Sequence, residues 1–163
     1  MALFALVLAQ AVGLAGPPAT LDLLLATFER FCLQTNADRN TFDAAIASAP
    51  DATKLSSPLT SSKVDFNRRW KIGSVELAFL DAPAPAGRSC AVTARTPGGF
   101  DGATIVREVA KLTASTTFDL VGGDPATIAR WSGIASDGSI IINNRPNPHG
   151  FGDVEIILRP ASD

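Results

Sequence analysis

The sequence predicts a single α+β domain in which helices pack on a mainly antiparallel sheet of about five strands. Before residue 50, and again from 101 to 115, apolar residues recur every three to four positions, as in amphipathic helices. From about Trp70 to 95, and again after 127, apolar and polar residues alternate, as in half-buried strands. The expected order is α-α-β-β-α-β-β-β. At 163 residues the chain suits one domain with its own core.

The first element is an uncharged apolar segment, MALFALVLAQAVGLAG. It is shorter than the roughly 20 apolar residues that a membrane span needs. It matches the hydrophobic region of a secretory signal peptide, although no Lys or Arg follows Met1. We therefore expect a signal peptide over 1–16 and a single exported domain over 17–163, without a transmembrane span and located in the periplasm or outside the cell. The alternative is a buried N-terminal helix or strand.

Two helices are expected next. In TLDLLLATFERFCLQT the apolar residues form one stripe, Thr20 can cap the helix start, and Cys32 falls on the apolar side near the end. A shorter helix is expected in NTFDAAIASAP, with Asn40 as the cap and Pro50 as the stop. The stretch from 51 to 62 is rich in Ser, Thr and Pro and predicts a loop.

The remaining elements alternate between strands and one helix. SVELAFL and SCAVTAR have the period of strands, and SCAVTAR places Cys90 on the same face as Val92 and Ala94. DGATIVREVAKLTAS predicts a helix capped by Asp101. TIARWSGIA, SIIIN and DVEIILR then predict three strands, with SDG as a hairpin turn and NRPNPHGFG as a long loop. No internal repeat is visible.

The two cysteines are expected to face the core from different elements, Cys32 from the first helix and Cys90 from a strand beneath it. In an oxidising compartment two thiols of one domain usually pair, so we predict a Cys32–Cys90 disulfide. The alternative is two separate buried thiols. The C-x-x-C spacing of redox pairs is missing, and the single histidine, His149, has no sequence tie to either cysteine. Two Cys and one His without finger spacing predict no zinc site, and we expect no metal or cofactor.

Two segments concentrate side chains that could contact a ligand or partner. NNRPNPHGFGD, 143–153, supplies Arg145, His149 and Phe151 in a Pro/Gly-rich stretch. The alternative is a plain hairpin connection, which is the favoured interpretation.

KVDFNRRWKIG is the second segment, and it supplies Arg68, Arg69 and Trp70. Such a basic–aromatic patch could meet anionic envelope polymers or lipid head groups. The favoured interpretation is again structural: a strand entering the sheet with Trp70 buried and the charges solvated.

The composition excludes several classes of function. With 14 basic and 16 acidic residues the net charge is −2, so nothing draws the whole molecule to nucleic acid. TPGGFDGAT has glycines before a helix but lacks the other residues of a phosphate-binding motif. SDGS lacks the acidic ligands of an EF-hand loop. RWSGIAS does not match the G-x-S-x-G nucleophile elbow of hydrolases. With one histidine and no tyrosine, the chain favours a non-catalytic protein that acts as a binding or interaction module. The alternatives are a hydrolase-like enzyme with a site around His149, and a structural accessory subunit of an envelope complex.

The apolar leader, the helix carrying FERFCLQT and the strand GRSCAVTA before a helix together give a resemblance. The chain resembles small, uncharacterised exported proteins of Gram-negative bacteria. The resemblance implies periplasmic localisation and supports the disulfide, and it implies no established activity. Expected partners are another envelope protein or an anionic envelope polymer.

Overall fold

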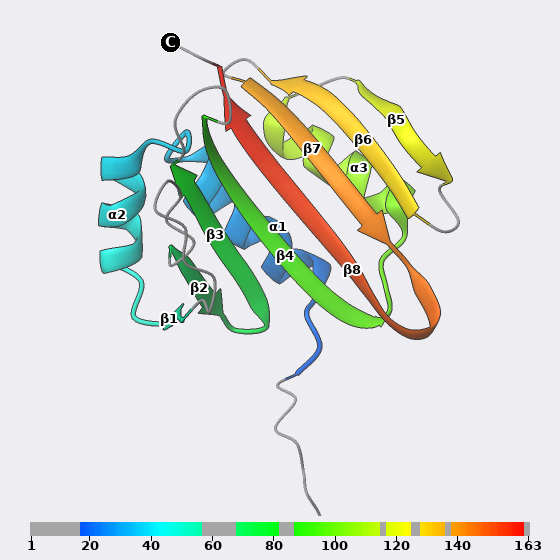
Figure 1. Ribbon diagram of the computed structural model, residues 1–163, viewed down its shortest axis with the longest axis horizontal. Helices are drawn as coiled ribbons and strands as arrows, with labels where there is room; N and C mark the ends of the chain where they lie inside the picture. Colours follow the sequence, from blue (N-terminus) through cyan, green and yellow to red (C-terminus); the bar gives the residue numbers. More distant parts are fainter. Residues whose placement is uncertain are drawn as a thin grey trace, which may run out of the picture.

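The domain is built on one eight-stranded antiparallel sheet with the strand order β1-β2-β3-β4-β8-β7-β6-β5 (Figure 1). The computed structural model describes residues 17–56, 68–81, 87–114, 117–124, 128–135 and 138–161. The predicted signal peptide lies outside these residues. The α+β class and the antiparallel sheet are confirmed. The predicted five strands and the order α-α-β-β-α-β-β-β were wrong.

The elements fall into two successive sets. The first contains α1 (Leu21–Phe28), a π-helical turn η1 (Glu29–Leu33), α2 (Arg39–Ala47), β1 (Ala52–Leu55), β2 (Arg69–Ile72), β3 (Val75–Asp81) and β4 (Arg88–Gly98). The second contains α3 (Gly102–Thr113), β5 (Phe118–Asp124), β6 (Ile128–Ala135), β7 (Gly138–Arg145) and β8 (Asn147–Pro160).

The strands that sequence reasoning missed are short or rich in glycine. β1 has four residues, too few for alternation to stand out, and it falls where a loop was predicted. β2, which also has four residues, is the strand that was expected to enter the sheet with Trp70 buried, but it was not counted among the five predicted strands. β5 contains Gly122 and Gly123, which resemble a turn, and its pairing with β6 shifts register between Leu120 and Gly122. The long loop predicted over NRPNPHGFG was also wrong. β7 runs to Arg145 and β8 begins at Asn147, because β4 continues far enough to pair with this hairpin.

The two sets have the same plan: helical structure followed by a meander of four antiparallel strands. They meet where β4 pairs with β8, so the strand order in the second half mirrors that in the first. α1 and α3 lie on the same face of the sheet, and α2 lies beside the end of the sheet that carries β1, β2 and β3 (Figure 1). The internal repetition is one of topology, and the sequence did not reveal it.

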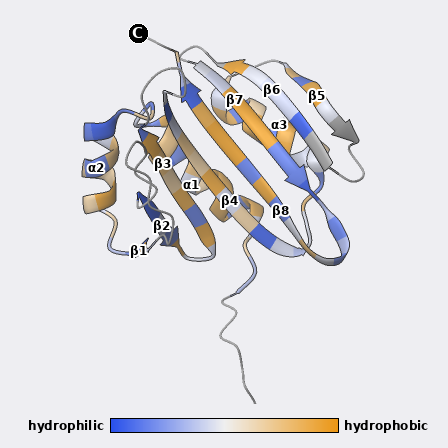
Figure 2. Ribbon diagram, in the orientation of Figure 1, coloured by the Kyte–Doolittle hydropathy of each residue, from blue (hydrophilic) through white to orange (hydrophobic). Residues whose placement is uncertain are grey.

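The core lies between the sheet and the helices α1 and α3. Alternate strand residues point into it, so buried and less buried positions alternate along β3 and β4. The middle of β3 is hydrophobic throughout (Figure 2). Val75, Leu77 and Phe79 of β3 are buried, as the alternation predicted. The inward-facing residues of β4 and β8 are buried too: Cys90, Val92, Ala94, Val154, Ile156 and Leu158.

The predicted disulfide is present. Cys32 of η1 and Cys90 of β4 are bonded, their Cα atoms are 5.4 Å apart, and both side chains are fully buried. The π-helical turn that carries Cys32 is marked by a hydrogen bond from the Gln34 backbone N–H to the Glu29 carbonyl oxygen, at 2.9 Å. The disulfide therefore joins the first helical segment covalently to the middle of the sheet.

Two of the three predicted helix caps are confirmed. The Thr20 hydroxyl accepts a hydrogen bond from Leu23 N–H at 3.2 Å, and the Asp101 carboxylate accepts one from Thr104 N–H at 2.8 Å. The prediction of Asn40 was wrong, because Asp38 caps α2 and accepts hydrogen bonds from the N–H groups of Asn40 and Thr41. The Thr41 N–H holds the pKa of Asp38 below its ordinary value, and the hydrogen bond with Thr104 does the same for Asp101.

We expect the disulfide to contribute substantially to stability. Its loop separates the cysteines by 58 positions, which corresponds to about 4 kcal/mol on the chain-entropy model. The C32A/C90A double variant should therefore unfold at a markedly lower urea concentration than the oxidised protein. Wild-type protein unfolded with a reductant present should behave like the double variant. Equal unfolding midpoints for the oxidised protein and the double variant would contradict a stabilising role.

Candidate functional site

The candidate site lies on the face of the sheet opposite α1 and α3. Among the described elements, no helix covers this face (Figure 1). The strand residues that alternate with the buried ones point outward here, and many of them are polar or charged. The antiparallel pairing then aligns them across the strands.

Two rows of outward-facing residues run across the sheet. In the longer row, cross-strand pairing connects Lys71, Glu76, Thr93, Glu155 and Asn143, from β2 to β7. In the neighbouring row, Asp153 of β8 pairs with Arg95 of β4 on one side and Arg145 of β7 on the other. Residues from 71 to 155 thus become neighbours through the sheet register alone.

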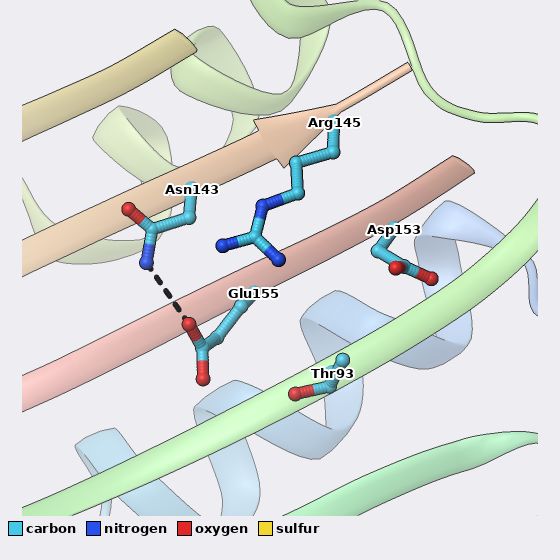
Figure 3. Close-up of a pocket in the computed structure, with 5 residues that line it drawn as sticks. All are labelled: Thr93, Asn143, Arg145, Asp153 and Glu155. Carbon is cyan, nitrogen blue, oxygen red and sulfur yellow. Dashed lines mark hydrogen bonds between the residues drawn. The ribbon is translucent and has the colours of Figure 1, made fainter. Parts of the chain in front are cut away.

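These rows enclose two adjoining hollows. The smaller, of about 130 Å³, is lined by Thr93, Asn143, Arg145, Asp153 and Glu155 (Figure 3). The larger, of about 410 Å³, is lined by Arg69, Lys71, Ser74, Glu76, Thr93, Arg95 and Asp153. Because both hollows share Thr93 and Asp153, we treat them as one outer groove that runs from β2 to β7.

Each of the three carboxylates in the outer groove has a partner. Asp153 accepts hydrogen bonds from Arg95, at 2.7 Å from Nε and 3.5 Å from Nη2. Glu155 accepts one from the Asn143 amide at 2.9 Å, and Glu76 pairs with Arg69. The hydrogen bond to Asp153 raises the pKa of Arg95 above its ordinary value.

Two cations of the outer groove differ from the rest. Lys71 and Arg145 are exposed, and neither has an ion pair or a side-chain hydrogen bond within the described part of the chain. The Arg145 guanidinium extends over β8, between the side chains of Asn143 and Asp153 (Figure 3). The groove therefore presents positive charge and hydrogen-bond donors that the other described residues leave available to a ligand.

Of the contact residues predicted in NNRPNPHGFGD, only some lie at the outer groove. Arg145 lines the outer groove. Phe151 precedes Asp153 by two residues on β8, so it lies on the same face, and its side chain is 59% exposed. His149 lies nearer the hairpin tip, where its backbone N–H donates to the Asn147 side-chain oxygen at 3.1 Å, and it does not line either hollow.

The residues predicted in KVDFNRRWKIG separate into two roles. The Arg68 guanidinium lies 4.9 Å from the centroid of the Phe79 ring and 5.9 Å from those of Phe42 and Trp70, and it pairs with Asp43 of α2. Trp70 is buried within this cluster, at 8% exposure. These two residues hold α2 against the sheet edge.

Arg69 points to the opposite face and lines the outer groove. The predicted patch thus mixes structural residues with one surface residue, because adjacent strand residues face opposite sides.

Most of the residues lining the groove were missed: Ser74, Glu76, Thr93, Arg95, Asn143, Asp153 and Glu155. In the sequence they are the polar residues of alternating strands, but any strand face exposed to water contains such residues. Only the register between strands shows that they converge.

Within the ranges the structure describes, no three His, Cys, Asp or Glu side chains gather as a metal site would require. None of the described helices has the length and apolar character to cross a membrane. No protein-family model, curated protein or solved structure matches the chain. The function is therefore inferred from the residues of the outer groove.

Neighbouring arginines should respond differently to substitution. Arg68→Ala removes a cation–π partner with a side chain only 13% exposed and leaves Asp43 unpaired, so we expect a loss of about 2 kcal/mol in the free energy of unfolding. Arg69→Ala breaks an exposed pair with Glu76 and should cost less than about 1 kcal/mol. Urea unfolding of both variants measures the difference. If the two losses were equal, Arg68 would have no special role in holding α2.

Proposed function

We propose that this protein is an exported, non-catalytic binding module of the cell envelope, and that the outer groove is its contact surface. The observation that carries the proposal is the convergence of hydrogen-bonding side chains in a hollow on the uncovered face of the sheet.

The chemistry of the described residues favours binding over catalysis. The three groove carboxylates are each already engaged by a donor from the sheet: Arg95, Asn143 or Arg69. His149, the single histidine, is exposed, and its imidazole makes no hydrogen bond among the described residues. These observations weigh against a hydrolase-like site around His149.

The disulfide supports export. Disulfides form and persist in oxidising compartments such as the periplasm, and they are rare where thiols are kept reduced. The Cys32–Cys90 bond is fully buried in the core, which suits a structural bridge rather than a redox-active one. Its presence agrees with the apolar leader at the start of the chain.

A second candidate is the accessory subunit. β5 is an edge strand, and two of its side chains are exposed: Leu120 at 47% and Val121 at 55%. Exposed apolar residues on an edge strand are suited to contact with another chain. This surface is separate from the outer groove, so the two candidates can be distinguished.

Site-specific crosslinking in the native cell tests which surface is used. A photoreactive benzophenone residue would replace Thr93 in the groove, Val121 on β5, or Ala103, which is exposed on α3 and serves as the matched control. We expect adducts with envelope material at Thr93 and none at Ala103. Adducts at Val121 alone would favour the accessory subunit, and equal yields at all three positions would contradict the proposal.

Intact mass of the protein recovered from the cell envelope tests export. We expect an N-terminus between residues 12 and 17 and no alkylation of Cys32 or Cys90 until a reductant is added. A protein that keeps its first residues and alkylates at both cysteines without reductant would refute export.

A further inference from the structure

We propose that the outer groove binds an acidic oligosaccharide, whose carboxylates pair with Arg145 and Lys71 and whose hydroxyls donate to the groove carboxylates. This inference rests on the proposed function and adds the chemistry of the ligand. It narrows the expected partners to the anionic envelope polymer.

Arg145 and Lys71, which make no ion pair or side-chain hydrogen bond with other described residues, favour an anionic ligand. The Arg145 guanidinium presents a planar fork of donors that matches a carboxylate, and Lys71 adds a second positive charge on β2. Four strand spacings separate β2 from β7, which corresponds to about 19 Å. One small anion cannot reach both cations, so the ligand is extended and carries its charges at separate points.

The carboxylates of the groove exclude a purely anionic chain. Glu76, Asp153 and Glu155 remain acceptors, since an ionised carboxylate has about four acceptor positions and the described partners occupy only some of them. A polyphosphate has no donors for these positions, and its dense charge would be repelled. Sugar hydroxyls donate to them, and Thr93 can both donate and accept. A carboxylated sugar chain combines the two requirements.

Apolar surface for the sugar rings lies on both sides of the rows. Ala78, Ala91 and Ile157, which are half-buried, form the next outward-facing row, in register from β3 to β8. Ile141 continues this row on β7 but is buried. At the other side, the exposed Phe151 ring offers a flat apolar surface next to Asp153. A sugar ring has polar edges and apolar faces, so it fits a groove with hydrogen-bonding side chains between apolar surfaces.

Isothermal titration calorimetry with three chains of similar length tests the ligand chemistry: hexagalacturonate, the neutral galactose hexamer and inorganic polyphosphate. We expect the oxidised wild-type protein to bind hexagalacturonate, to bind the other two at least about tenfold more weakly, and to lose affinity as salt is raised. R145Q and K71Q should each weaken binding of hexagalacturonate by about tenfold or more.

R159Q is the matched control, because Arg159 is an exposed arginine on the same face of β8 outside the groove lining. It should bind within about twofold of the wild type, which is well below the effect of losing a charged hydrogen bond. Circular dichroism establishes that all three variants are folded.

Several results would overturn the inference: equal binding of the neutral hexamer, tighter binding of polyphosphate, equal losses in R159Q and R145Q, or no binding of hexagalacturonate. The crosslinking experiment separates this failure from that of the proposed function. If Thr93 still forms adducts in the cell, the groove is a binding surface for a ligand of different chemistry. If Thr93 also forms none, the proposed function fails as well.

Discussion

The pairing of β4 with β8 is the constraint on which the rest of the structure depends. It joins two four-stranded meanders, each preceded by helical structure, into one sheet. The same pairing buries Cys90 beside Leu158 on the inner face, and it sets Thr93 beside Glu155 and Arg95 beside Asp153 on the outer face. A slip of one residue in this register would turn the core residues outward and break up both the core and the groove.

The disulfide and the arginine–aromatic cluster stabilise the first half in different ways. Cys32–Cys90 ties the first helical segment to the sheet centre, whereas Arg68 and its rings hold α2 at the sheet edge. Both use one side chain to join elements that are distant in the sequence. Neither lies on the outer face, so the residues of the outer groove take no part in holding the helices to the sheet.

The alternation of residues explains how much of the site could be predicted. The period of SVELAFL predicts a half-buried strand, and Val75, Leu77 and Phe79 are its buried face because residues at every second position share one side. The local chemistry of Arg145 and Arg69 predicts that they contact a ligand or partner, and both line the groove. Glu155, Asp153 and Thr93 gave no local signal, because a polar residue facing water is what any exposed strand face contains.

The sequence by itself determined the α+β class, the direction in which Cys32 and Cys90 face, and the caps at Thr20 and Asp101. These follow from periodicity and from side-chain chemistry within a few residues. Only the tertiary structure decided the number of strands and the gathering of Lys71, Thr93, Arg145 and Glu155 in one groove. Short or glycine-rich strands such as β1 and β5 are stabilised by their neighbours rather than by their own propensity, and strand register is a property of the whole sheet.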